Sequence, residues 1–142
     1  MMTFFWRMLV CLFVLTISGC QYQGPESLRP FTTDGCSNFP DGSLYHKKLW
    51  LNCCVVHDLQ YWSGGTYEER LQADEELLAC VKSVGEPAIA NMMLAGVRVG
   101  GSPWWPTRFR WGYGWPYTHG YRALTPAEMD QVVKMRDTQI SK

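Results

Sequence analysis

The sequence predicts a small, mainly helical domain that is cross-linked by disulfides. Two Thr-x-x-Glu capping boxes each stand directly before a segment with helical character, and a third, strongly apolar segment precedes them. Of the six cysteines, Cys11 and Cys20 belong to an expected leader and its cleavage site, so four remain. An even remainder in an exported chain favours two disulfides, each contributing roughly 2–4 kcal/mol by constraining the unfolded state.

The first helix is expected from about Leu49 to Ser63, because this segment is apolar on nearly every side. His57 and Asp58 interrupt its apolar surface. A carboxylate buried without a partner costs several kcal/mol or takes up a proton. Asp58 is therefore expected either to face solvent or to meet a cation, and a bound metal is one candidate.

The second helix is expected after Gly64-Gly65, where Thr66 and Glu69 form a capping box, and it runs to about Val84. Asp74 lies on its apolar stripe and therefore points toward the neighbouring helix. The other expected members of this stripe are Tyr67, Leu71, Leu78 and Val81.

The spacing of these residues predicts a histidine–carboxylate pair. If Cys53 is bonded to Cys80 and the two helices are antiparallel, His57 lies four residues forward and Asp74 six residues backward. These steps correspond to a rise of roughly 6 and 9 Å, so the side chains lie within about 3 Å of each other along the axis. In such a pair the acid orients the imidazole tautomer and stabilises its protonated form.

The pattern resembles the secreted phospholipase A2 superfamily, whose active helix carries Cys-Cys-x-x-His-Asp-x-x-Tyr. The match covers about residues 34 to 84 and includes an aspartate six positions before a cysteine in the second helix, and an upstream cysteine. The matching residues in this chain are Cys36, Cys53, Cys54, His57, Asp58, Tyr61, Asp74 and Cys80.

The resemblance implies a pair of disulfide-linked antiparallel helices beside a metal-binding loop; it does not extend to the aromatic-rich irregular segment and the C-terminal helix that are expected after them. It further implies the disulfides Cys36–Cys54 and Cys53–Cys80. In the implied catalytic set, His57 is the general base for water, Asp74 orients it, and Tyr61 donates a hydrogen bond to Asp74.

The resemblance also implies that Asp58 binds Ca²⁺ together with backbone oxygens near Gly35, Ser37 and Phe39, since Ca²⁺ takes six to eight oxygen ligands. The implied activity is calcium-dependent hydrolysis of the sn-2 ester of phospholipids. A calcium ion would act in this reaction as a Lewis acid on the carbonyl oxygen.

The expected metal loop, residues 34 to 42, departs from the family pattern because it keeps the first glycine and the cysteine but replaces later glycines. This departure favours an alternative, a non-catalytic envelope lipoprotein that binds lipid, glycan or a protein partner. Asp34 and Asp41 offer extra carboxylates or turn residues. Zinc ligation by the cysteines and His57 is a competing interpretation, although adjacent cysteines lack the usual Cys-x-x-Cys spacing.

The N-terminal segment has the layout of a signal peptide, with Arg7 before an apolar run that is too short to span a bilayer. Ile17-Ser18-Gly19-Cys20 resembles a bacterial lipobox, which implies cleavage before Cys20 and lipidation of its thiol. A short uncleaved anchor is the alternative. We therefore expect a signal peptide over 1–19, a tether over 20–30 and one domain over 31–142, in an exported, membrane-anchored lipoprotein. Gln21 resembles lipoproteins sent to an outer membrane, where a cell has two membranes.

Two further helices are expected, one from Pro87 to about Val97 and one from Pro126 to about Thr138, each with proline at its first position. Between them, Ser102 to Tyr121 is rich in Trp and Tyr and has no clear periodicity. Three interpretations remain open for it: a membrane-interface surface, a sugar-binding platform, or coil folded into the core.

The net charge and the other two histidines do not indicate a second functional site. The formal net charge is zero and no long basic run is present, so nothing favours a nucleic-acid partner. His46, next to two lysines, is expected to be solvated, and His119 has no partner at a defined spacing.

Overall fold

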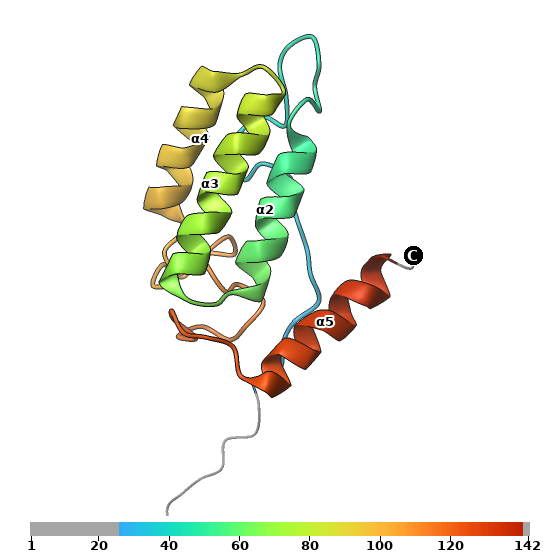
Figure 1. Ribbon diagram of the computed structural model, residues 1–142, viewed down its shortest axis with the longest axis vertical. Coiled ribbons are helices and arrows are strands. Elements are labelled where there is room, and N and C mark those ends of the chain that lie inside the picture. The colour runs from blue at the N-terminus through green and yellow to red at the C-terminus, as the bar shows by residue number, and fades with distance from the viewer. Residues whose placement is uncertain (1–25, 141–142) are drawn as a thin grey trace, which may run out of the picture.

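The computed structural model describes residues 26–140, and this part of the chain is helical with no strand (Figure 1). The helices are α2 (Leu51–Ser63), α3 (Tyr67–Ser83), α4 (Pro87–Gly100) and α5 (Pro126–Ile140). Within residues 26–140, none of these helices combines the length and the apolar character that a membrane span requires. The expected leader and Cys20 lie outside the described residues.

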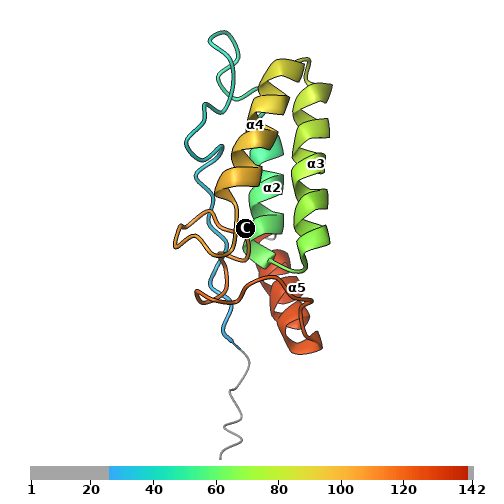
Figure 2. The same cartoon turned by 90° about the vertical axis from the view of Figure 1, so that its left-hand side faces the viewer.

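Helices α2, α3 and α4 lie side by side with alternating chain direction, and α3 contacts both of the others (Figures 1 and 2). Helix α5 packs against one end of this bundle, and residues 41 to 48 form a loop that projects at the opposite end. The bundle core is built from apolar side chains of the loop and the three helices. They are Cys36, Trp50, Cys53, Cys54, Leu77, Val81, Ala90 and Met93.

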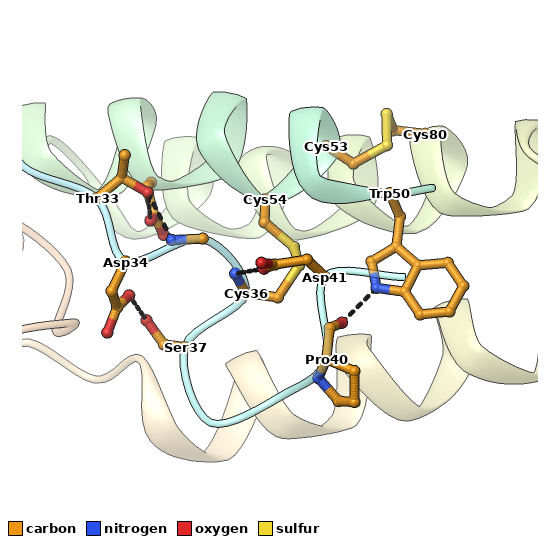
Figure 3. Close-up of a disulfide and its surroundings, with 12 residues drawn as sticks. Thr33, Asp34, Cys36, Ser37, Pro40, Asp41, Trp50, Cys53, Cys54 and Cys80 are labelled. Carbon is orange, nitrogen blue, oxygen red and sulfur yellow. Dashed lines mark hydrogen bonds between the residues drawn. A yellow bond between two sulfur atoms is a disulfide. The ribbon is translucent and has the colours of Figure 1, made fainter. Parts of the chain in front are cut away.

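Both disulfide pairings implied by the resemblance are confirmed. Cys53 joins α2 to Cys80 on α3 with a Cα–Cα distance of 5.7 Å. Cys54 joins α2 to Cys36 in the upstream loop with a Cα–Cα distance of 5.1 Å, as Figure 3 shows. Because all four thiols are consumed in disulfides, the zinc interpretation is wrong.

Both predicted capping boxes are present. Glu69 N–H donates to Thr66 Oγ1 at 3.2 Å, and Thr66 N–H donates to the Glu69 carboxylate at 2.7 Å. Thr125 and Glu128 make the same reciprocal pair at 3.3 and 2.8 Å. These bonds satisfy amide donors that the first helical turn leaves unpaired.

The helix limits differ from the predictions by a few residues. Helix α2 begins at Leu51 instead of about Leu49, because Trp50 N–H donates to Asp41 O and holds the preceding residues in a turn. Helix α4 continues to Gly100 and α5 to Ile140, beyond the predicted ends at Val97 and Thr138.

The predicted buried stripe of α3 is partly wrong. Val81 and Asp74 are buried as expected, but Tyr67 is 47% exposed. The buried face instead contains Arg70. The helix is therefore rotated toward a face that carries two charged side chains, which burial tolerates because each charge meets partners from neighbouring elements.

The aromatic segment, residues 102 to 121, has no regular secondary structure and closes the C-terminal end of α2. The last carbonyls of a helix have no intrahelical donor. Here Tyr61 O accepts from Gly112 N–H at 2.7 Å, and Ser63 O accepts from the Trp115 indole N–H at 2.7 Å. Gly114 N–H donates to Trp62 O at 3.1 Å. The core interpretation of this segment thus applies to residues 110 to 115 and 119 to 120, whereas Trp104, Trp105 and Tyr117 are exposed.

A second apolar cluster fixes α5 and the start of the described chain. Leu28 packs with Trp62, Trp115 and Val132, all of which are almost fully buried. Leu28 N–H donates to the Gln131 side chain on α5 at 3.0 Å. The last residues of the expected tether are therefore packed against the domain, since Leu28 gains more by burial than by remaining in solvent.

Glu128 links α5 to the chain before it. It accepts two hydrogen bonds from the Arg122 guanidinium, at 2.8 and 2.5 Å. These bonds lower the pKa of Glu128 from its ordinary 4.5 to about 2, assisted by the backbone and side chain of Thr125. Carboxylates held in this way stabilise the folded state only while they are ionised.

We predict a specific acid sensitivity at this contact. Because the pKa of Glu128 is depressed on folding, its contribution is fully present above about pH 4.5 and is lost as the pH falls toward 2. Urea unfolding curves between pH 5 and 2 should show a shallower pH dependence for Glu128→Gln than for the unaltered chain. Asp137→Asn, at an exposed position on the same helix, should leave the slope unchanged. Equal slopes for all three chains would contradict the prediction.

Candidate active site

The structure brings together the predicted histidine, aspartate and tyrosine. His57 Nε2 lies 3.0 Å from Asp74 Oδ1, across the α2–α3 contact. Tyr61 O–H donates to the same Asp74 oxygen at 2.7 Å. All three residues are buried, and Asp74 has 0% exposure. Desolvation, and then the charge of Asp74, raises the pKa of Tyr61 well above its ordinary value, so its hydroxyl stays a hydrogen-bond donor.

The hydrogen bond to Asp74 selects the tautomer of His57. A carboxylate accepts hydrogen bonds, so Nε2 of His57 carries the proton and Nδ1 presents its lone pair. Within residues 26–140, Nδ1 makes no hydrogen bond, and His57 lines a cavity. The ring is therefore oriented as a general base requires.

Two arginines that the sequence analysis missed also meet Asp74. Arg98 of α4 places Nε 3.0 Å from Oδ2 of Asp74, an ion pair whose angle lies outside that of a hydrogen bond. Arg70, one turn before Asp74 on α3, has Nε 4.0 Å from the same oxygen. The i,i+4 spacing of Arg70 and Asp74 was a signal in the sequence for this pairing. Arg98 had none, because it comes from another helix.

Arg70 ties the site to the C-terminal end of α4. Its Nε donates to Tyr61 O–H at 3.1 Å, and its Nη2 donates to the carbonyls of Val97 and Arg98 at 2.9 Å each. A further bond goes to Tyr121 O–H in the aromatic segment. One buried guanidinium thus connects α2, α3, α4 and the aromatic segment around the tyrosine that binds Asp74.

His57 opens onto a cavity of about 370 Å³ between the upstream loop, α2 and α4. Asp58 and Tyr61 also line it. The remainder of the wall is mostly apolar, and its larger side chains are Phe39, Leu77, Met92, Met93, Val97 and Phe109. An apolar cavity with a few polar groups at one point is the usual form of a small-molecule site.

Asp58 points from α2 toward the upstream loop. Its Oδ2 accepts a hydrogen bond from Thr33 Oγ1 at 2.6 Å, and Thr33 Oγ1 in turn accepts from Gly35 N–H at 3.1 Å. Burial raises the pKa of Asp58 to about 6, and the nearby Asp34 acts in the same direction, whereas Thr33 and His57 oppose the rise. Thr33 is a further site residue that the sequence analysis missed, since no spacing links it to Asp58.

The loop is compact and rich in oxygen atoms, as Figure 3 shows. Gly35 has a left-handed φ of 77°, and a side chain there would collide with Asp41 Oδ1, which accepts from Cys36 N–H at 2.9 Å. Asp41 therefore serves the turn, one of its two expected roles. Asn38 supplies a second left-handed position, at φ 58°, a conformation that glycine adopts more readily than other residues.

The residue types along this side of the cavity are those that calcium ions bind in proteins. Gly35, Ser37, Phe39 and Asp58 all line the 370 Å³ cavity, and every ligand atom they offer is an oxygen. Asp34 joins Asp58 and Ser37 along an adjoining groove of about 140 Å³, which brings a second carboxylate near the first. Hard cations such as Ca²⁺ bind preferentially at carboxylate and carbonyl oxygens.

The other two histidines lie away from this cavity. His46 is exposed in the projecting loop, as predicted. His119 is buried, stacks on Trp115 with ring centroids 5.0 Å apart, and has Nδ1 2.7 Å from the Glu26 carboxylate. Together with Glu128 these groups resemble a metal-ligand set in spacing, but the Arg122 guanidinium already meets Glu128, His119 and Glu26 within 4 Å.

Comparisons with known proteins give no match: no family model, no curated protein and no solved structure matches this chain.

The position of Tyr61 depends on a glycine after α4. A Cβ atom at Gly101 would lie 2.4 Å from Tyr61 Oη and 2.5 Å from its ring, whereas a Cβ at Gly96 would meet nothing within 4 Å. We therefore expect Gly101→Ala to lower the free energy of unfolding by about 1–3 kcal/mol through overpacking. Gly96→Ala, the matched control, should leave it unchanged or raise it by up to about 1 kcal/mol. Urea unfolding measures both, and equal values would contradict the expected contact.

Proposed function

We propose that this protein is a phospholipase A2-type hydrolase that cleaves the sn-2 ester of phospholipids with the His57–Asp74 pair and Ca²⁺. The observation that carries the proposal is the 3.0 Å contact between these side chains at the wall of an apolar cavity that also holds Asp58. The mainly helical fold and its two disulfides are compatible with that family.

In the proposed reaction His57 Nδ1 removes a proton from a water molecule in the cavity as the water attacks the ester carbonyl carbon. The imidazolium formed is stabilised by Asp74, which keeps the Nε2 proton in place. The proton then passes from Nδ1 to the leaving alkoxide, so the products are a fatty acid and a lysophospholipid. Tyr61 and Arg98 hold the two oxygens of Asp74 in position.

Asp58 and loop oxygens of Gly35, Ser37 and Phe39 would hold Ca²⁺, which when bound supplies positive charge to the ester carbonyl oxygen. The apolar wall built from Leu77, Met92 and Met93 suits an acyl chain, because burying it there removes hydrocarbon from water. Export and anchoring through a lipid on Cys20 belong to the same proposal and would bring the site to its substrate.

The catalytic assignment is tested by His57→Ala. Release of fatty acid from mixed micelles of phospholipid and neutral detergent should fall by about 10²–10⁴, the range attributed to general-base catalysis. His46→Ala, at an exposed position in the projecting loop, is the matched control and should retain activity. A chelator should abolish release by the unaltered chain. Full activity in a folded His57→Ala chain would overturn the assignment.

The metal assignment is tested by Asp58→Asn. Calorimetric titration with CaCl₂ should show an affinity at least about tenfold weaker, because a carboxylate ligand loses its charge. Asp130→Asn, on the exposed face of α5, should bind calcium like the unaltered chain. Equal affinities for the two variants would remove Asp58 from the proposed ligand set.

The exposed aromatic side chains Trp104, Trp105 and Tyr117 favour a second candidate, a non-catalytic lipoprotein of the cell envelope that binds lipid, glycan or a protein. Trp and Tyr are typical of such surfaces because they pair an apolar ring with a polar edge. The same micelle assay separates the two functions: binding without release of fatty acid supports this second candidate.

A further inference from the structure

Three arginines of the described residues, Arg29, Arg110 and Arg136, have no carboxylate partner within 4 Å, and Arg136 donates to Ser63 Oγ at 3.4 Å. Arg70 and Arg98 meet Asp74, and Arg108 and Arg122 meet acidic groups of their own. Arg29 and Arg110 donate instead to backbone carbonyls, and neither forms an ion pair within residues 26–140.

These two guanidinium groups converge on one oxygen atom. Arg29 Nη2 lies 3.2 Å and Arg110 Nη2 lies 2.7 Å from Trp115 O. Arg110 is buried, with an exposure of 4%. Further hydrogen bonds to Trp111 O and Gly112 O fix the plane of its guanidinium group. Burial, and then the charge of Arg29, lowers the pKa of Arg110. Two like charges held this close are favourable only if something compensates them.

A groove of about 550 Å³ runs over this pair. Arg29, Arg108 and Arg110 line it, and its lining includes no acidic residue. Thr107 lines it too, and its buried hydroxyl has no hydrogen-bond partner within residues 26–140. Pro106, Pro116 and Tyr117 complete the wall, with Tyr117 5.7 Å from the guanidinium of Arg110. The groove thus offers positive charge, a free hydroxyl and rigid sides.

We propose that this groove binds a phosphate-type oxyanion between Arg29, Arg110 and Arg108. Guanidinium groups match the geometry of phosphate oxygens and hold their charge when buried. A hydroxyl such as that of Thr107 supplies the neutral donor that phosphate sites commonly add. Arg108 lines both this groove and the groove of Asp34 and Asp58, and it pairs with Asp34 at 3.2 Å, whereas His57 lines neither groove, so the proposal does not depend on the proposed hydrolysis.

Two sources of phosphate have the same chemistry, a free phosphate ester and the headgroup of an anionic lipid. The exposed rings beside the groove, Trp104 and Trp105 at 59% and 53%, are of the kind that sits at a lipid–water boundary. Arginines near such a surface add attraction to anionic headgroups. The experiment therefore compares both sources directly.

The test follows the side-chain Nε–H signals of Arg29 and Arg110 by NMR, using the full chain in neutral detergent with a chelator present throughout. One arm adds sodium phosphate, and the other adds phosphatidylglycerol to the micelles, with phosphatidylcholine as its zwitterionic comparison. Saturable shifts with sodium phosphate identify a site for free phosphate. Shifts with phosphatidylglycerol alone identify a headgroup site.

Arg29→Gln should weaken the binding seen in either arm by about fivefold, the scale expected for one basic side chain at an anionic surface. Lys82→Gln removes the same charge in the last turn of α3, at the opposite end of the bundle from the aromatic segment, and should bind like the unaltered chain. Equal weakening in Arg29→Gln and Lys82→Gln, or no saturable shift in either arm, would overturn the proposal.

Discussion

The arrangement of the helical bundle depends on one buried carboxylate. Asp74 has 0% exposure, and an ionised group at such a position costs several kcal/mol unless partners surround it. Its partners come from three helices: His57 and Tyr61 from α2, Arg70 from its own helix α3, and Arg98 from α4. Sliding α2 or α4 by one turn would remove some of these partners and leave the charge less well compensated. The same requirement that fixes the packing of α2, α3 and α4 therefore also orients the imidazole at the cavity wall.

The two disulfides, which lie outside the site, also fix the position of α2 relative to α3 and to the upstream loop. Cys53–Cys80 holds α2 against α3 one helical turn before His57, and Cys36–Cys54 holds the upstream loop against the next residue of α2. Adjacent cysteines on a helix point in directions about 100° apart, so one faces α3 and the other the loop. This arrangement brings Thr33 and Gly35 close to Asp58, as the chain of hydrogen bonds through the Thr33 hydroxyl shows.

The parts that the sequence predicted are those with local or motif-borne signals. Both capping boxes lie within four residues, so their hydrogen bonds form in any helix that starts there. The His57–Asp74 contact followed from helical rise and an assumed cross-link. The contact of Arg98 with Asp74 was not predictable, because the two residues lie on different helices and are 24 positions apart in sequence (98 minus 74). On α3 the periodicity favoured Tyr67 over Arg70, since hydropathy ignores the partners that make a buried guanidinium tolerable.

The aromatic segment resisted prediction for a related reason. Its conformation is set by hydrogen bonds to residues at and just after the end of α2. Trp111 Nε1 donates to Gly65 O and Trp115 Nε1 donates to Ser63 O, over sequence separations of 46 and 52 residues. Such bonds leave no period to detect. They also explain how two arginines come to lie unpaired by acids. The N–H groups of Gly112 and Gly114 donate to Tyr61 O and Trp62 O of α2, while the carbonyls of Gly112 and Trp115 accept hydrogen bonds from Arg110. The segment that caps α2 with two of its N–H groups therefore also supplies the carbonyl oxygens that bind the guanidinium groups of Arg29 and Arg110.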